Sequence, residues 1–149
     1  MRTVVLGVGN TIMRDEGVGV RCIELLLAEH ALPEGVVAVD GGTSTHELLG
    51  DVEGVDLLVI VDAVVTGGPP GSLIRLEGDR IPSAFSNKLS PHQHGINDLL
   101  ATLQLVGRAP ARVVLHGVMP GVMELGMDLS PEVEAALPEL AARVLAEVA

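Results

Sequence analysis

Continuous apolar runs constrain the fold of this chain more than any other feature of its sequence. The clearest is residues 57–61, five aliphatic side chains that Asp62 follows directly. A strand with one face in water alternates apolar and polar residues, whereas an unbroken apolar run indicates burial on both faces, as in a parallel sheet covered by helices. We predict further strands in the short β-branched or apolar stretches at residues 3–7, 36–39 and 112–118.

Helical periodicity fills segments between these strands. Apolar residues recur at helical spacing through residues 17–31, and a short helix is expected at residues 47–50. A third helix should begin at Ser90, because Ser, Pro and Gln there supply an N-cap, a first-turn proline and a capping box, and it should end at Gly107. Its expected buried stripe comprises Leu99, Leu100, Leu103 and Val106.

The last helix is predicted to start at Ser130 and to present one apolar face to the core. Pro138 lies inside its pattern and is expected to kink or restart it. The expected inner face comprises Val133, Leu137, Leu140, Val144 and Leu145. Residues 72–76 alternate as an edge strand or a hairpin arm does, and residues 77–88, which have no clear period, are predicted to form a loop.

Strands alternate with helices along the whole sequence, and no internal repeat or linker interrupts them. We therefore predict a single domain over residues 1–149 with an α/β fold. Its architecture should be a three-layer α/β/α sandwich with a mostly parallel sheet and one antiparallel edge strand at residues 72–76.

Charge and cysteine content exclude several classes of function. Twenty acidic residues against nine basic ones give a formal net charge of -11, which argues against nucleic acid and anionic membranes as partners. Cys22 is the only cysteine, so no internal disulfide can form, and its apolar helical surroundings predict a buried, inert thiol. No signal-peptide pattern occurs and no apolar run approaches about 20 residues, so we expect a soluble, cytoplasmic protein.

The glycine loop at residues 7–10 is similar to the start of a dinucleotide-binding fingerprint. However, Ile12 stands where that motif requires its third glycine, and the predicted helix begins too late. Asp15 and Glu16 at the helix start would also repel a pyrophosphate. The pattern therefore argues against a dinucleotide cofactor.

Three side chains that can bind a metal are predicted to meet at the carboxyl edge of the sheet, namely Glu16, Asp62 and His92. Ligands bind at that edge in open α/β sheets, and carboxylates and a neutral imidazole are metal ligands. The positive end of a helix dipole would keep His92 neutral. Each residue also has a purely structural interpretation: Glu16 complements the helix dipole, Asp62 caps a helix or forms a turn, and His92 is a surface histidine.

Other residues compete for these positions. Asp15 is an alternative to Glu16, although an acidic residue in a first helical turn is also explained by the helix dipole. His94 and His116 are alternatives to His92. His116 lies in the middle of a predicted strand, where a hydrogen-bonded core histidine is the commoner state. No H-E-x-x-H or G-x-S-x-G signature is present.

Several ordered motifs together are similar to those of the hydrogenase maturation endopeptidases, which process the large subunit of nickel-iron hydrogenases. The motifs lie at residues 4–10, 15–19, 40–43, 61–63 and 87–93, and the likeness continues into the terminal helix. The resemblance therefore covers nearly the full length of the chain. A set of motifs in one fixed order is much more specific than any one of them.

The resemblance implies roles for individual residues. In that family an acidic residue after the first glycine loop, an aspartate at the end of the third strand and a histidine in the S-P-H-Q segment hold nickel. Glu16, Asp62 and His92 are the matching positions. The nickel is expected to come with the substrate, so no permanent cofactor is implied. Asp40 matches a further acidic position and is, with Asp62, a catalytic candidate that either orients the substrate or assists proton transfer.

By resemblance, the chain is expected to be an endopeptidase whose partner is the precursor of a nickel-iron hydrogenase large subunit. It would remove the C-terminal extension after nickel insertion and use the bound nickel as its recognition signal. The alternative is a non-catalytic chaperone that senses nickel in the precursor without cutting it. No conventional nucleophile is visible in the sequence, so the sequence does not separate the two.

Overall fold

The structure is a computed structural model of the chain, and it describes the backbone of residues 1–43, 45–84 and 91–149. Side chains are described for the same residues except 45–46 and 91–94. The predicted helix start at Ser90 lies outside the described residues.

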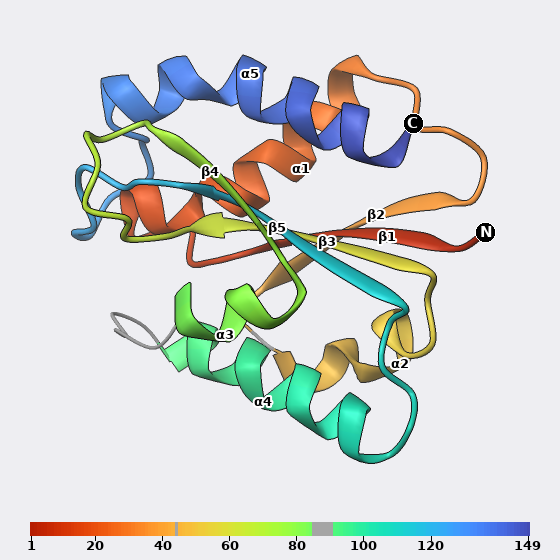
Figure 1. The fold of residues 1–149 in the computed structure, drawn as a ribbon. Coiled ribbons are helices and arrows are strands. Elements are labelled where there is room, and N and C mark those ends of the chain that lie inside the picture. Colours follow the sequence, from red (N-terminus) through yellow and green to blue (C-terminus); the bar gives the residue numbers. More distant parts are fainter. Residues whose placement is uncertain (44, 85–90) are drawn as a thin grey trace.

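A five-stranded sheet forms the middle layer of the molecule (Figure 1). Its strands lie in the order β2-β1-β3-β5-β4; the first four are parallel, and β4 pairs antiparallel with β5 at the edge. Every residue of β1 and β3 is buried, as their unbroken apolar sequences predict. The predicted fold class is therefore confirmed. The strands are β1 (Thr3–Val8), β2 (Val36–Gly42), β3 (Leu57–Ala63), β4 (Leu73–Glu77) and β5 (Arg112–Val118).

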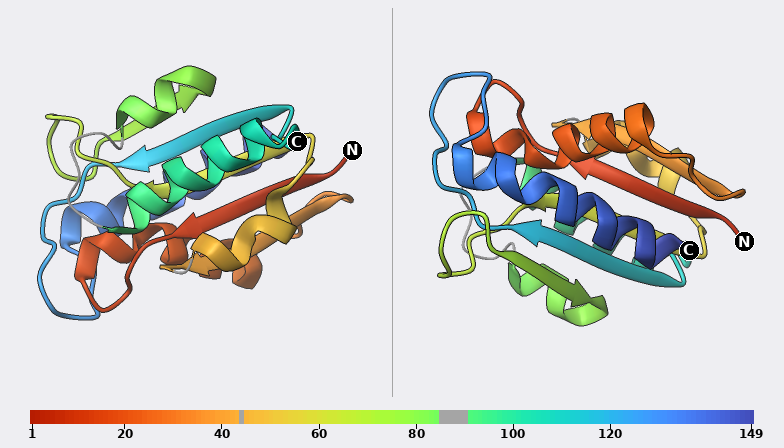
Figure 2. Two further views of the ribbon diagram at one scale, coloured as in Figure 1. Left: turned by 90° about the horizontal axis from the view of Figure 1, so that it is seen from below. Right: turned by 90° about the horizontal axis from the view of Figure 1, so that it is seen from above.

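Helices cover both faces of this sheet (Figures 1 and 2). The helices α1 (Val18–Glu29) and α5 (Pro131–Val148) lie on one face. The other face is covered by α2 (Leu49–Val52), α3 (Ile81–Ala84) and α4 (Pro91–Leu105). Short 3-10 turns precede three of the helices: η1 (Arg14–Gly17), η2 (Thr45–Leu48) and η3 (Gly78–Arg80). In the described part of the chain, no helix is long and apolar enough to cross a membrane.

The hydrophobic core is divided by the sheet into two clusters. Along β3, Val59 and Val61 pack toward α1 and α5, whereas Leu58 and Ile60 pack toward the opposite layer. This alternation follows from the pleat of a strand, which points successive side chains to opposite faces. Cys22 is fully buried in the first cluster, and burial raises the pKa of its thiol to about 12. The predicted burial of this thiol is thus confirmed.

Three local predictions need correction. Residues 77–88 are not all loop, because the 3-10 turn η3 and the short helix α3 occupy most of their described part. Val106 does not belong to the buried stripe, because its side chain is 58% exposed. The helix α4 ends at Leu105, so helical periodicity no longer predicts which way the Val106 side chain points. Ile96 is the fully buried residue that the predicted stripe omitted. Pro138 is accommodated within one continuous helix.

Helix α1 packs unusually close to the carboxyl ends of β1 and β3. A Cβ atom added at Gly19, in the first turn of α1, would lie 2.1 Å from the Val61 carbonyl oxygen and 2.6 Å from the Val8 carbonyl oxygen. No side chain fits at such distances, so glycine is required there for steric reasons. This contact fixes the start of α1 against the edge of the sheet where functional residues were predicted.

We predict that Gly19→Ala lowers the free energy of unfolding by about 1 to 3 kcal/mol, because its methyl group would meet backbone on two strands. The matched control is Gly50→Ala in α2, where an added Cβ meets nothing within 4 Å. Alanine in that open helical position should be neutral or slightly stabilising. Urea unfolding of both variants checks this, and equal midpoints would contradict the steric argument.

An ion-pair network joins β4 and β5 to the end of α5. The Nε2 atom of His116, a side chain 3% exposed, lies 3.0 Å from Oε1 of Glu147, and Arg75 donates two hydrogen bonds to the same carboxylate. These Arg75 bonds, helped by His116, lower the pKa of Glu147 to about 2 although partial burial opposes them. Burial lowers the pKa of His116 despite its bonded carboxylate. The hydrogen-bonded core histidine predicted at this position is confirmed.

We predict that stability decreases as the pH falls. The unfolded chain takes up protons on His116 near pH 6.5 and on Glu147 near pH 4.5, whereas the folded chain takes them up only at lower pH. The free energy of unfolding should therefore decrease as the pH is lowered from about 6.5, and it should decrease more steeply between pH 4.5 and about 2.

Urea unfolding at several pH values measures this dependence. Glu147→Gln should flatten the steeper acidic part, whereas Glu139→Gln, on the exposed side of α5, should leave it unchanged. The same slope below pH 4.5 in Glu147→Gln and in the unmodified protein would show that this network is not its source.

Candidate functional site

The direction of the chain reverses across the sheet between β1 and β3. From β1 the chain crosses through α1 to β2, and from β2 it returns over the opposite face to β3, which pairs with the other side of β1. The loops that leave the carboxyl ends of β1 and β3 therefore diverge, which makes this place the switch point of the sheet. In open α/β sheets this switch point is where ligands bind. Glu16 and Asp62 lie at it.

Asp62 is the last polar side chain of β3 and is fully buried. It lies opposite Gly117 of β5, and its Oδ1 atom accepts a hydrogen bond of 2.8 Å from the Ala63 N–H. The pleat of β3 directs Asp62 toward the face that α2, α3 and α4 cover, because its neighbours Val61 and Ala63 pack against α1 and α5. A carboxylate so placed is desolvated and yet borders the switch point.

Gly9 brings the loop after β1 against both acidic candidates. The φ angle of Gly9 is +133°, a conformation that glycine adopts readily and other residues rarely adopt. A Cβ atom added to Gly9 would lie 1.9 Å from the Glu16 carbonyl oxygen and 3.5 Å from Oδ1 of Asp62. Glu16 itself is partly exposed in the 3-10 turn η1. The fold therefore brings both the Glu16 backbone and the Asp62 carboxylate close to one glycine.

Asp40 lies at the carboxyl end of β2 and is exposed. Its Oδ1 atom accepts a hydrogen bond from the Gly42 N–H, and the Gly42 carbonyl oxygen accepts one of 2.8 Å from the Gly9 N–H. A shift in the pairing of β1 with β2 occurs at the same place. Asp40 therefore shapes a turn that is hydrogen-bonded directly to the Gly9 loop. Strand β1 lies between Asp40 on β2 and Asp62 on β3.

Asp15 has a role that the sequence did not predict. It is fully buried, and its carboxylate accepts four hydrogen bonds from the segment before α5. The donors are the N–H groups of Gly121, Val122 and Ser130, at 2.8, 2.7 and 2.7 Å, and the Ser130 hydroxyl at 2.7 Å. Asp15 lies in the first turn of η1, as the helix-dipole interpretation expects, but its side chain makes no cap bond at η1 or α1.

The environment of Asp15 stabilises its charge. Burial alone would raise the pKa of this carboxyl, but the hydrogen bonds from Val122, Ser130 and Gly121 outweigh it and lower the pKa. Backbone bonds between Arg14 and Gly126 and between Gly126 and Ile12 hold the same two segments together. Asp15 is therefore a structural anchor that joins the loop before α1 to the segment before α5.

The structure describes the side chain of His116 but only the backbone of His92 and His94. The backbone of His92 lies in the first turn of α4, and Figure 1 shows the start of that helix at the same end of the molecule as the carboxyl ends of β3 and β5. The side chains of His92 and His94 lie outside the described residues. Among the side chains that are described, no group of three His, Cys, Asp or Glu residues is arranged to hold a metal. His116 is bonded to Glu147 and faces α5.

Comparison with known proteins places this geometry in a family. The profile of the hydrogenase maturation protease family matches residues 20–147. The hydrogenase 2 maturation protease of Escherichia coli is 43% identical over 147 residues, which span 98% of this chain and 90% of that protein. The chain belongs to the hydrogenase maturation protease family. Its membership agrees with the sheet order described above.

Solved structures of maturation proteases share the fold. The hydrogenase maturating endopeptidase HybD from E. coli superimposes with a TM-score of 0.94 at 42% identity, over 99% of this chain and 91% of that chain. The [NiFe] hydrogenase maturation protease HybD from Thermococcus kodakarensis gives a TM-score of 0.83 at 26% identity, with both chains fully covered. The architecture of this family member is therefore close to that of experimentally determined relatives.

We predict that Asp15→Asn lowers the free energy of unfolding by about 2 to 3 kcal/mol, because one carboxylate oxygen becomes an NH₂ group that faces hydrogen-bond donors. Amide hydrogen exchange at Val122 and Ser130 should accelerate, since both N–H groups lose a charged acceptor. Asp128→Asn, on the exposed side of the same loop, is the control. Unchanged exchange at Val122 would contradict the anchoring role.

Proposed function

We propose that this protease removes the C-terminal extension of a nickel-iron hydrogenase large-subunit precursor once nickel has been inserted. The observation that carries the proposal is a buried carboxylate, Asp62, beside Gly9 and Glu16 at the switch point of a chain from the maturation protease family. Glu16, Asp62 and His92 bind the nickel of the precursor. The metal belongs to the substrate, and the protease uses it to recognise a precursor that is ready for cleavage.

The donor set suits a metal that arrives already partly coordinated. Two carboxylates and one imidazole are borderline-hard ligands, and three protein ligands leave positions for groups that the precursor supplies. Asp62 is fully buried, so its negative charge would attract a cation at the switch point more strongly than the charge of an exposed carboxylate would. Glu16 follows the anchored Asp15 directly, and this neighbour limits how far its backbone can move.

The structure argues against a thiol nucleophile. Cys22, the only thiol of the chain, is buried in the core, with its pKa raised to about 12. Attack by water is consistent with this arrangement, and Asp62 and Asp40 are the carboxylates that could orient it or move its proton. Asp40 is exposed on the turn attached to Gly9, so its side chain can meet the incoming peptide.

We predict that Asp62→Asn and His92→Ala each reduce the rate of tail removal by about 100-fold or more, the range lost with a group that acts directly in the chemistry. Asn keeps the shape of Asp62 and can still accept the Ala63 hydrogen bond, so folding should survive. Intact mass spectrometry measures processing of nickel-loaded precursor by substoichiometric enzyme, with nickel-free precursor alongside.

Asp98→Asn, an exposed acid on α4, and His30→Ala, an exposed residue after α1, are matched controls. Tail loss restricted to the nickel-loaded precursor supports nickel-dependent recognition. Tail loss from both precursors would overturn it. A stable complex with nickel-loaded precursor whose mass never changes would overturn the protease proposal in favour of a nickel-sensing chaperone.

A further inference from the structure

The edge of the sheet at β2 is open. β2 pairs with β1 on one side, and in the sheet of the described residues it has no strand on the other. Residues 36–39 of β2 are Val-Val-Ala-Val, without the charges or prolines that usually protect an edge strand from pairing. Val37 is 57% exposed. An unprotected apolar edge of this kind is a template for an added strand.

The register of β2 shows which backbone groups are directed outward. Thr3 is paired with Val36, and its N–H donates to the Gly35 carbonyl oxygen at 2.9 Å. In a parallel ladder the bonding direction alternates, so the odd-numbered residues of β2 bond to β1. The backbone groups of Ala38 and Asp40 therefore point away from the sheet, where an incoming strand can bond to them.

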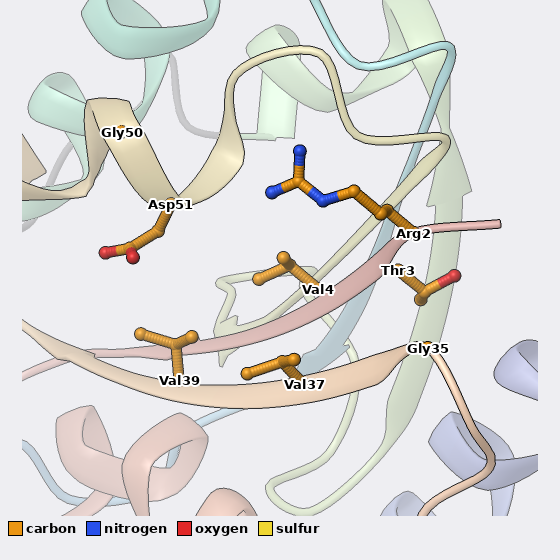
Figure 3. Close-up of a pocket in the computed structure, with 8 residues that line it drawn as sticks. All are labelled: Arg2, Thr3, Val4, Gly35, Val37, Val39, Gly50 and Asp51. Carbon is orange, nitrogen blue, oxygen red and sulfur yellow. The ribbon is translucent and has the colours of Figure 1, made fainter.

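A groove of about 300 Å³ lies under the same edge, between β2 and α2. Val37 and Val39 line it with alternate side chains of one strand, and Arg2 and Asp51 lie on its far side. Figure 3 shows the two valines and the Arg2 guanidinium on the α2 side of the strands. Alternate side chains of an added strand would enter this groove, which is how strand addition combines backbone bonding with side-chain selection.

The edge leads directly from the candidate site. β2 ends in the turn whose Gly42 carbonyl oxygen bonds to Gly9, next to Asp62. From Asp62 on β3, a peptide that crosses the Gly9 loop at the end of β1 reaches the carboxyl end of β2. Running antiparallel to β2, it would cover Asp40 to Val36 in about 15 Å and then reach Arg2, a cation in a chain of net charge -11.

We propose that the C-terminal extension of the precursor binds as an added antiparallel strand on the free edge of β2, with its terminal carboxylate near Arg2. This inference rests on the proposed function, because it assigns a position to the tail that the protease removes. Backbone bonding to Ala38 and Asp40 supplies most of the recognition. Tails of differing sequence can therefore bind, provided that they can extend along the strand.

A synthetic peptide with the sequence of the precursor's extension tests this directly by fluorescence anisotropy. Val37→Asp places a charge on the edge, and Ala38→Pro removes one outward N–H without touching the bonds to β1. Both variants should raise the Kd of the peptide and the KM for nickel-loaded precursor by about tenfold, with kcat within about twofold. Val106→Asp is the matched control, at 58% exposure against 57% for Val37.

Shortening the tail of the precursor to about three residues provides a second test. A tail that ends before β2 should raise KM for the unmodified enzyme, and Val37→Asp should then cause no further rise, because the contact is already absent. Amidating the peptide's C terminus should weaken its binding to the unmodified protein and have no effect on Arg2→Ala. An equal effect of amidation on both proteins would overturn the placement of the carboxylate.

The outcomes separate this inference from the proposed function. If the unmodified protein cleaves nickel-loaded precursor but Val37→Asp and Ala38→Pro bind peptide as Val106→Asp does, the strand proposal is wrong and the protease assignment stands. If no precursor is cleaved, the proposed function fails, and the peptide-binding comparison still decides whether β2 holds the tail. If Val37→Asp only converts a dimer into a monomer, β2 pairs with a second copy and the proposal is overturned.

Discussion

The Asp15 carboxylate holds together two segments that are more than 100 residues apart in the sequence. It accepts four hydrogen bonds from residues 121–130, and these bonds offset the cost of burying a charge. The adjacent residue, Glu16, lies partly exposed at the switch point of the sheet. One acidic residue is thus fully used in fixing the loop, and its neighbour is carried to the edge where a ligand can meet it.

Close backbone approach completes the site. Gly19 lets α1 touch the ends of β1 and β3, and Gly9 lets the Glu16 backbone approach Asp62. The second contact brings the Glu16 backbone close to the Asp62 carboxylate, with no side chain at residue 9 to separate them. Such close packing would suit the proposed nickel recognition, because ligands that are held in place before binding lose less conformational entropy when a metal is bound.

Cleavage and tail recognition would use different parts of the same sheet. Asp62 lies at the carboxyl end of a central strand, where both faces are covered, whereas β2 lies at the edge and keeps one side open. The turn that contains Asp40 and Gly42 connects the two regions through its bond to Gly9. A substrate could therefore be held by backbone bonding along β2 while its metal is recognised by side chains at the switch point.

Local sequence patterns determined the elements of this protein, and only the tertiary structure decided the partners of its polar groups. Unbroken apolar runs predicted the buried strands, because apolar neighbours on both sides of a residue indicate that it is buried. For the same reason, the position of His116 within a predicted strand indicated a hydrogen-bonded core histidine. The same patterns misplaced Val106, since helical spacing says nothing about where a helix stops. They did not reveal the anchoring role of Asp15: its donors come from residues 121–130, and a hydrogen bond over such a separation depends on how the layers pack, which no local pattern encodes.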